Sequence, residues 1–336
     1  MINFILVIPI LASFFITLFL MPFWIRKAKQ IGLLWDDMNK IKSEKVAGSG
    51  GIMIILGFIA GSFLYVSYRV FILKTSASLI EIFAILSVIL LLAGIGLIDD
   101  LLGWQHGGLS RRSRIILVFL ASIPLIAINA GKNTVGIPFI GETNLGLIYP
   151  FILIPLGIVG ATTTFNFLAG FNGLEAGQGI LLLSALSLIA FFTGSPWLAM
   201  ISLCMVASLF AFLLFNYVPA KVFPGDILTY SVGGLIALMA IFGNFEKVAV
   251  FFFIPNIIEV ILKSRGKLVK SSFGQPNKDG SLKLRYGKIY GLTHLSIYLY
   301  EKIGIKPIEK RVVYLIWSFQ ILIIILGFII FRNGIF

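Results

Sequence analysis

Residues 79–98 read LIEIFAILSVILLLAGIGLI and are followed directly by Asp99 and Asp100. About 20 apolar residues in a row are enough to cross the hydrocarbon core of a bilayer as a helix. Comparable runs recur along the chain at 3–24, 50–67, 115–130, 147–164, 179–193, 197–216, 227–244, 248–262 and 312–331. The sequence therefore predicts an all-α integral membrane protein, a bundle of about ten transmembrane helices in one polytopic domain over residues 1–336.

The composition agrees with this prediction. Of the 336 residues, 59% are hydrophobic and only 12% are charged, which is about half the charged fraction of a soluble protein. A soluble protein with deeply buried helices would not need so many runs of this length. The net charge is +13, but the basic residues lie between membrane spans. We therefore expect them to meet anionic lipids and phosphorylated substrates, and we expect no nucleic acid partner.

The distribution of Lys and Arg predicts the orientation of the chain. If the N-terminus lies outside, the cytoplasmic loops hold 22 of the 27 basic residues. Such a bias predicts that both termini are extracytoplasmic and that the number of spans is even. These cytoplasmic loops are 25–49, 99–114, 165–178, 217–226 and 263–311. The last loop is expected to contain a short amphipathic helix around 294–303, and the outer segment 131–146 a short hairpin.

Asp99 and Asp100 form the first polar cluster. Two adjacent carboxylates at a membrane edge repel each other, so solvent, a cation or a protonated partner must offset the repulsion. An acidic pair at the end of a helix also opposes the helix dipole. A solvated helix end, a Mg²⁺ site and a general base are all compatible with this pair.

Two further clusters lie on the same predicted membrane face. Residues 166–179 read NFLAGFNGLEAGQG, in which glycines let backbone N–H groups approach a ligand and carboxamides can bind a base or ribose. An ordinary turn is the alternative. Residues 222–226 read VFPGD, and Asp226 there either caps a helix or binds a metal. These acids and amides are the hard oxygen ligands that suit Mg²⁺, whereas one cysteine and two histidines argue against zinc.

These stretches carry a family resemblance. NFLAGFNGLEAGQG, the IGLIDD pair and VFPGD before a glycine-bearing helix resemble the polyprenyl-phosphate N-acetylhexosamine-1-phosphate transferases in type and order. The first stretch is most similar to the eukaryotic and archaeal dolichyl-phosphate GlcNAc branch. The resemblance covers nearly the whole chain and implies a ten-span fold with the active site at the cytoplasmic face.

The same resemblance implies a reaction. GlcNAc 1-phosphate would pass from UDP-GlcNAc to a polyprenyl (dolichyl) phosphate, giving polyprenyl diphosphate-GlcNAc and UMP, as the first membrane step of glycan assembly. The implied cofactor is Mg²⁺, with Mn²⁺ as a substitute. The implied partners are the two substrates and membrane lipids, and a homodimer stays open.

The residue roles that the resemblance implies fall into three groups. The metal ligands are Asp226 and Asn166. The substrate contacts are Asn172 (to uracil), Gly173, Glu175, Gln178 and Lys45. The catalytic group comprises Asp99, Asp100 and a following basic residue, Arg111 or Arg112. The loop 263–311 departs from both branches, and its candidates for the diphosphate are Lys267, Lys270 and Lys278.

A transporter or lipid flippase is the alternative function. It would need polar residues near the membrane midplane, often on broken helices. Glu81 and Glu259 instead fall near the ends of predicted spans, and the polar clusters gather on one face, which favours an enzyme. The resemblance favours a prokaryotic plasma membrane, the archaeal kind included, over the endoplasmic reticulum.

Overall fold

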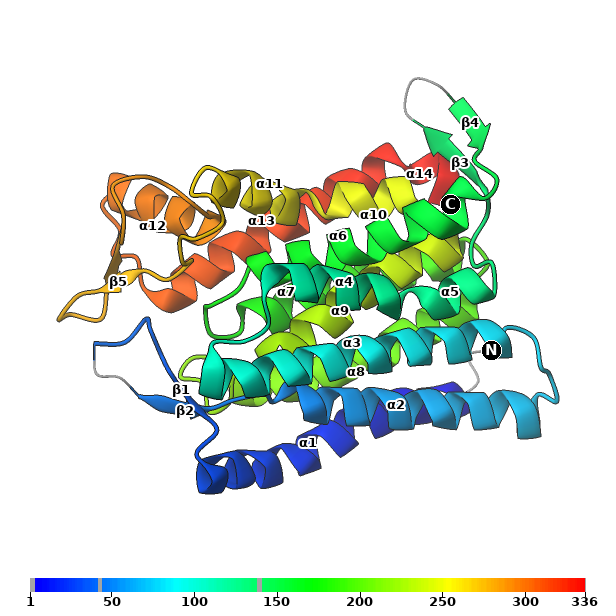
Figure 1. Ribbon diagram of the computed structural model, residues 1–336, viewed down its shortest axis with the longest axis horizontal. Coiled ribbons are helices and arrows are strands. Elements are labelled where there is room, and N and C mark those ends of the chain that lie inside the picture. Colours follow the sequence, from blue (N-terminus) through cyan, green and yellow to red (C-terminus); the bar gives the residue numbers. More distant parts are fainter. Residues whose placement is uncertain (1–3, 42–43, 138–140, 336) are drawn as a thin grey trace.

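Figure 1 shows the computed structural model, an elongated bundle of helices in which residues 4–41, 44–137 and 141–335 are described. The helices are α1 (Val7–Ile31), α2 (Gly51–Ser67), α3 (Leu79–His106), α4 (Arg111–Ala121), α5 (Ile123–Ala127), α6 (Ile154–Phe167), α7 (Leu174–Phe192), α8 (Pro196–Asn216), α9 (Gly225–Gly243), α10 (Glu246–Phe252), α11 (Ile254–Ser264), α12 (Leu292–Lys302), α13 (Glu309–Ile330) and α14 (Arg332–Ile335). Other helical turns lie at Phe4–Leu6, Tyr68–Ile72 and Tyr149–Leu153. Three antiparallel strand pairs occur in these ranges: β1 (Leu34–Asp36) with β2 (Lys45–Ala47), β3 (Thr134–Ile137) with β4 (Gly141–Asn144), and β5 (Gln275–Pro276) with β6 (Leu282–Lys283).

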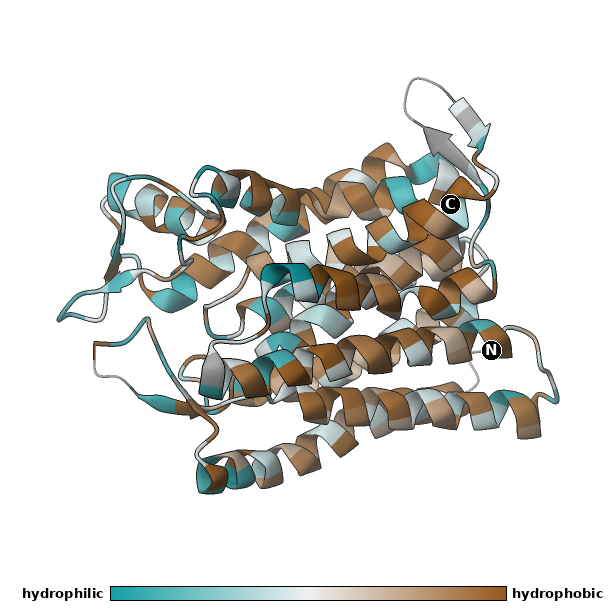
Figure 2. Cartoon of the chain, viewed as in Figure 1, coloured by the Kyte–Doolittle hydropathy of each residue, from teal (hydrophilic) through white to brown (hydrophobic). Residues whose placement is uncertain are grey.

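Eight helices of the described chain are long and apolar enough to cross a membrane. They are α1, α2 with its extension to Ile72, α3, α6 with the turn before it, α7, α8, α9 and α13. Large hydrophobic side chains such as Phe19, Ile80 and Ile329 are exposed on the outer helices, and the ribbon in Figure 2 is coloured as hydrophobic along most of their length. Lipid rather than water can solvate such surfaces along whole helices. The prediction of an all-α integral membrane protein is confirmed.

The remaining two predicted spans are each interrupted. Helices α4 and α5 meet at Ser122, and α10 and α11 meet at Phe253. Pro124 and Pro255 are the second residues of the helices that follow. Proline lacks a backbone N–H and its ring clashes with the preceding turn, so a new helix begins there. The ten predicted spans thus correspond, over the described ranges, to eight continuous helices and two broken pairs.

Helix α9 is buried along almost its whole length between α3 and α6. A Cβ added to Gly96 of α3 would lie 2.6 Å from the backbone nitrogen of Ile227 in α9. One added to Gly233 of α9 would lie 2.8 Å from the carbonyl oxygen of Ala161 in α6. Because the glycines allow backbone contact on both sides, the end of α3, the end of α6 and the start of α9 meet in a small space.

The polar loops gather at one end of the bundle. Figure 1 shows the N and C marks at one end, whereas β1, β2, β5 and α12 lie at the opposite end. Termini at the same end agree with an even number of crossings. The predicted helix in loop 263–311 is confirmed as α12, and the predicted hairpin as the pair β3–β4, whose residues 138–140 lie outside the described ranges.

The contact between α1 and α2 gives a test of the packing. A Cβ added to Gly57 would overlap the Thr17 hydroxyl and lie 2.7 Å from the Ser13 carbonyl oxygen, whereas one added to Gly94 of α3 has no atom within 4 Å. We expect Gly57→Ala to lower the free energy of unfolding by about 1–3 kcal/mol, because the two helices must separate. Thermal unfolding in detergent measures this, with Gly94→Ala as the matched control. Equal melting temperatures for the two variants would contradict the packing.

Candidate active site

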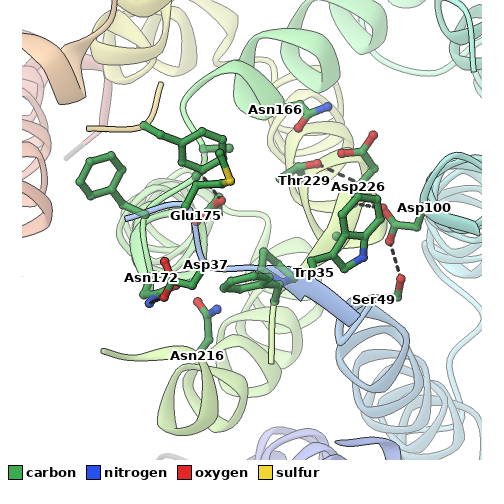
Figure 3. A pocket seen from close by; sticks show the side chains of 18 of the residues that line it. Trp35, Asp37, Ser49, Asp100, Asn166, Asn172, Glu175, Asn216, Asp226 and Thr229 are labelled. Atoms are coloured by element: carbon green, nitrogen blue, oxygen red, sulfur yellow. Dashed lines mark hydrogen bonds between the residues drawn. The ribbon is translucent and has the colours of Figure 1, made fainter. Parts of the chain in front are cut away.

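A cavity of about 540 Å³ opens at the end of the bundle that carries the polar loops. Its lining comes from the β1–β2 hairpin, the ends of α3 and α6, the loop before α7, the end of α8, the start of α9 and the large loop, as Figure 3 shows in part. The lining residues are Trp35, Asp36, Asp37, Met38, Ser49, Asp100, Asn166, Ala169, Gly170, Phe171, Asn172, Glu175, Asn216, Phe223, Pro224, Gly225, Asp226, Thr229 and Phe273. The three polar clusters predicted to converge therefore do share one cavity.

Asp99 is buried behind the cavity and is fully hydrogen-bonded. One of its carboxylate oxygens accepts from the Leu109 backbone N–H at 2.8 Å and from Arg114 Nη2 at 3.0 Å. The other oxygen is 2.6 Å from Arg114 Nε and accepts from the Tyr230 hydroxyl at 3.2 Å. These partners fix the carboxylate and offset its charge, so Asp99 joins α3, α4 and α9 rather than facing the cavity.

The basic residue beside the acidic pair is Arg114. Its Nη1 also lies 3.9 Å from Asp226 Oδ2, so one guanidinium stands between two of the clustered acids. The two candidates from the sequence, Arg111 and Arg112, are exposed on the first turn of α4, and Arg111 donates to the Leu268 carbonyl oxygen at 3.1 Å. Helical periodicity explains the difference, because Arg114 lies one turn beyond Ser110, the N-cap of α4, on the side that faces α3.

Asp100 lies at the cavity and holds the start of α9. Its Oδ1 accepts from the Asp226 backbone N–H at 2.8 Å, and its Oδ2 accepts from the Ser49 hydroxyl at 2.9 Å. Gly225 has a φ of +71°, and a Cβ there would overlap the Asp100 carboxylate. A side chain of α3 thus satisfies one of the free N–H groups at the α9 N-terminus. Asp226 is the second residue of α9 and the helix has no side-chain cap hydrogen bond, so the alternative that Asp226 caps its own helix is wrong.

The Asp226 carboxylate is consequently available to the cavity. Its side chain is 24% exposed, and Figure 3 shows it near Asn166. The Asn166 carboxamide has no hydrogen-bond partner in the described part of the chain. No group of three or more His, Cys, Asp or Glu side chains among the described residues could hold a metal ion by itself. Mg²⁺ does not require one, since it is commonly bound by one or two protein oxygens together with substrate phosphates and water.

The loop before α7 is held by several side chains. Asn172 donates its backbone N–H to Glu309 Oε1 and its Nδ2 to Asp37 Oδ2, each at 3.0 Å. Gly173, with a φ of +84°, donates its N–H to Asn216 Oδ1 at 3.0 Å. These bonds fix the position of the loop against three other segments of the chain.

Glu175 and Gln178 differ in their relation to the cavity. Glu175 lines the cavity, but it is buried and accepts the Gly170 N–H at 2.8 Å, which closes its own loop. Gln178 is buried one turn further along α7, is not among the described lining residues, and has no hydrogen-bond partner within the described chain. The structure therefore brings Glu175, but not Gln178, to the cavity.

Residues 37–40 of the hairpin loop lie outside the predicted motifs, yet they connect the loops that line the cavity. Asn39 donates to the Gly170 carbonyl oxygen at 2.9 Å and accepts the Gly274 N–H at 3.2 Å. Lys40 lies 2.5 Å from Glu309. The available signal was the run Asp36-Asp37-Met38-Asn39-Lys40, since adjacent acids are rare in this chain. Lys45 is exposed on β2, outside the lining that the described residues form.

The large loop contributes Phe273 and a smaller adjoining cavity. This cavity, of about 310 Å³, is lined by Met38, Gly274, Gln275, Pro276 and Arg285. Its shared residue, Met38, joins it to the main cavity. Lys267, Lys270 and Lys278 do not belong to either lining as far as the chain is described. Among the described residues, Arg285 is the basic residue of this loop that lines one of the two cavities.

His294 contacts two separate segments of the large loop through its ring nitrogens. It is buried, accepts the Tyr290 N–H through Nδ1 at 3.4 Å, and contacts the Phe273 carbonyl oxygen through Nε2 at 3.3 Å. Burial lowers the pKa of His294, so the ring is neutral at pH 7. A neutral ring with the proton on Nε2 can make both bonds at once.

The charge of the cavity lining is one-sided. Five carboxylic acids line the main cavity, and no Lys or Arg does so among the described residues. The acids are Asp36, Asp37, Asp100, Glu175 and Asp226. A phosphorylated ligand would therefore meet several acids, offset by two cations just outside the lining, Lys40 beside Asp37 and Arg114 beside Asp226.

A second, apolar cavity of about 500 Å³ runs along α6, α9, α10 and α11. Gly157 and Gly160 of α6 line it, and a Cβ added to either meets no atom within 4 Å. Thr164 lines this groove and Asn166, two residues further along α6, lines the main cavity. The groove and the acidic cavity therefore both border α6 and share no lining residue among the described residues.

Comparison with known proteins agrees with this site. A family model described as glycosyl transferase family 4 matches residues 82–244, a range that includes Asp99, Asn166, Asn172 and Asp226. A protein of Saccharolobus solfataricus, named as a proposed UDP-N-acetylglucosamine–dolichyl-phosphate N-acetylglucosaminephosphotransferase, is 36% identical over 97% of this chain and 96% of its own length. The chain belongs to glycosyl transferase family 4.

Other relatives are similar over smaller shares of the chain. The UDP-N-acetylglucosamine–dolichyl-phosphate N-acetylglucosaminephosphotransferase of Dictyostelium discoideum is 30% identical over 69% of this chain and 65% of its own length. The phospho-N-acetylmuramoyl-pentapeptide-transferase of Halalkalibacterium halodurans is 30% identical over 80% of this chain and 87% of its own length. The resemblance drawn from the three motifs is confirmed, and the relatives favour a transferase over a transporter.

The environment of Asp99 predicts how three arginines differ. Arg114→Gln would leave a buried carboxylate without its cation, so we expect the free energy of unfolding to fall by about 3–5 kcal/mol. Arg111→Gln and Arg112→Gln change exposed residues and should stay within about 0.5 kcal/mol of the parent protein. Thermal or denaturant unfolding in detergent compares the three. A similar loss in all of them would contradict the pairing of Arg114 with Asp99.

Proposed function

We propose that this protein transfers GlcNAc 1-phosphate from UDP-GlcNAc to a polyprenyl phosphate of the dolichyl type, giving polyprenyl diphosphate-GlcNAc and UMP. The observation that carries the proposal is an acidic, polar cavity at one end of the bundle and an apolar groove that borders the same helix, α6. A reaction between a water-soluble nucleotide sugar and a membrane-bound lipid phosphate needs both kinds of site. The names of the Saccharolobus and Dictyostelium relatives support the same substrates.

Each substrate has a place consistent with its chemistry. The nucleotide sugar fits the main cavity, where Asn172 offers a carboxamide and Trp35, Phe223 and Phe273 offer apolar surface for a base or sugar. The lipid chain fits the groove along α6, and its phosphate would then lie near Asn166. Arg285, at the adjoining cavity, is placed to meet the diphosphate or sugar from the solvent side.

The residues present fit a Mg²⁺ ion, with Mn²⁺ as a substitute. Asp226 and Asn166 would hold it, because both side chains line the cavity and offer the oxygen ligands that Mg²⁺ prefers. The bound ion would neutralise the diphosphate and stabilise the charge that develops on the departing UMP. This cofactor also explains how five lining acids are compatible with a polyanionic substrate.

The chain's own residues position the reacting groups. A lipid phosphate oxygen forms a bond to the phosphorus that carries the sugar, and the bond from that phosphorus to the UMP oxygen breaks. The lipid phosphate has a second pKa of about 6 and is mostly ionised at neutral pH, so the step requires no strong base. We therefore assign Asp99 and Asp100 to positioning: Asp99 orients Arg114, and Asp100 holds the α9 turn that presents Asp226.

The archaeal relatives support a location in an archaeal plasma membrane. In that membrane the polar end of the bundle would face the cytoplasm, where nucleotide sugars occur, as the distribution of basic residues predicts. The donor then reaches the cavity from water, and the acceptor reaches it from the bilayer.

Release of UMP by the purified protein tests the reaction. With UDP-GlcNAc, a polyprenyl phosphate and Mg²⁺, we expect turnover that requires all three components and stops on addition of EDTA. Asp226→Ala should reduce kcat by about 10²–10³-fold, because an oxygen ligand for the ion is lost. Asp279→Asn, at an exposed acid that pairs with Lys306 at 3.0 Å, is the control and should retain turnover. Turnover by folded protein in EDTA would exclude the metal, and no turnover with several lipids and UDP-sugars would exclude the reaction.

Filling the groove tests the place of the lipid. Gly160→Leu adds a side chain where no protein atom lies within reach of a Cβ, so the fold should be retained. We expect the KM for a long-chain polyprenyl phosphate to rise about 10-fold, as a few buried CH₂ groups lose their contacts, with little change for a short-chain analogue. Steady-state kinetics with both acceptors measures the difference. An equal change for the two acceptors would place the lipid elsewhere.

A further inference from the structure

The orientation of the Asn172 side chain is fixed by Asp37. Asn172 Nδ2 lies 3.0 Å from Asp37 Oδ2, and both side chains are buried at the edge of the cavity. An ionised carboxylate can only accept hydrogen bonds, so the amide nitrogen rather than the amide oxygen must face Asp37. Lys40 Nζ lies 4.0 Å from the same carboxylate oxygen.

The backbone around Asn172 is held as well. Its N–H donates to Glu309 Oε1 at 3.0 Å, and Glu309 Oε2 is 2.5 Å from Lys40 Nζ. Asp37 is itself fixed, because its Oδ1 accepts the Asn39 N–H at 3.1 Å. Rotation of the Asn172 backbone or of its carboxamide would therefore break buried hydrogen bonds. The loss of a buried hydrogen bond costs more free energy than the loss of an exposed one.

This orientation defines what Asn172 offers to a ligand. The amide oxygen is left as an acceptor, and the second N–H of Nδ2 is left as a donor next to it. Uracil presents a donor at N3 and an acceptor at O4, which is the complementary pair. Cytosine presents an acceptor at N3 and a donor at its amino group, so Asn172 would have to turn over and place its oxygen against the Asp37 carboxylate.

We propose that Asp37 is a positioning residue that makes Asn172 select uracil over cytosine nucleotides. The proposal rests on the proposed function, in which Asn172 contacts the base of the nucleotide sugar. The expected preference is about 10–100-fold in affinity, since binding of the wrong base leaves buried polar groups unpaired. The same mechanism needs no contact between Asp37 and the ligand.

The test is the ratio of the dissociation constants of CMP and UMP, measured by calorimetry on the full-length protein in detergent with Mg²⁺. An amide at position 37 can donate or accept, so Asp37→Asn frees Asn172 to adopt either orientation. We expect this variant to reduce the ratio to within about 5-fold of unity, because either orientation now keeps its hydrogen bond. Retention of the full preference in Asp37→Asn would overturn the proposal.

Two further variants separate orientation from general loosening. Glu309→Gln removes the ion pair with Lys40 but leaves the Asp37–Asn172 bond, so both nucleotides should bind more weakly at an unchanged ratio. If this variant also abolishes the preference, the ratio reports loosening and the proposal is wrong. Glu44→Gln, at an exposed acid outside the described cavity lining on the same hairpin, is the control and should keep both affinities.

If Asp37→Asn does not fold, Asn172→Ala provides the test. This variant removes the side chain that selects the base, so UMP and CMP should bind about equally. Retention of the preference for UMP in Asn172→Ala would overturn the proposal. The outcomes also separate the two proposals. Turnover of UDP-GlcNAc with a base preference that ignores Asp37 would refute only this inference. A preference that depends on Asp37, in a protein that never releases UMP from UDP-GlcNAc, would refute only the proposed reaction.

Discussion

The bond between the Asp100 carboxylate and the first turn of α9 is the contact on which the site depends. It joins α3 to α9 across a distance that only glycine permits, since Gly225 leaves no room for a side chain beside the carboxylate. Because Asp100 accepts the Asp226 N–H, the Asp226 side chain is not needed as a cap and can face the cavity. A buried carboxylate without partners would destabilise the folded protein. Asp100 instead links two helices, because its oxygens accept hydrogen bonds from Ser49 and from the α9 N-terminus.

Much of this arrangement could be predicted from the sequence, because membrane spans and short polar motifs leave clear local signals. Apolar runs located the helices, and the distribution of basic residues placed the acidic pair, the NGLE loop and the FPGD turn on one face. The signal was weaker where a span is broken. Composition alone reads residues 115–130 and 248–262 as continuous, and only the proline at the second helical position interrupts them.

The details of the site that could not be predicted are those set by helix rotation and by long-range contacts. Arg111, Arg112 and Arg114 are equivalent in type and nearly so in position, and only the docking of α4 against α3 selects Arg114. Asp37 and Glu309 meet at Asn172 although they are far apart in the chain, and nothing local in either segment indicates this contact. Gln178 belongs to the same motif as Asn172 and Glu175, which line the cavity, but it lies one helical turn beyond Glu175, in the packed interior.

The link between Asn172 and Glu309 has a consequence for the synthesis of the protein. Glu309 begins α13, the last long helix of the described chain, whereas Asn172 precedes α7. A growing chain that has inserted its helices up to α11 therefore contains both acids of the α3 pair, Asn166 and Asp226, but still lacks the residue that receives the Asn172 N–H. The loop that carries Asn172 gains this bond only when α13 joins the bundle, so on the proposed function the nascent protein would encounter lipid phosphates in the membrane before the loop is held in place.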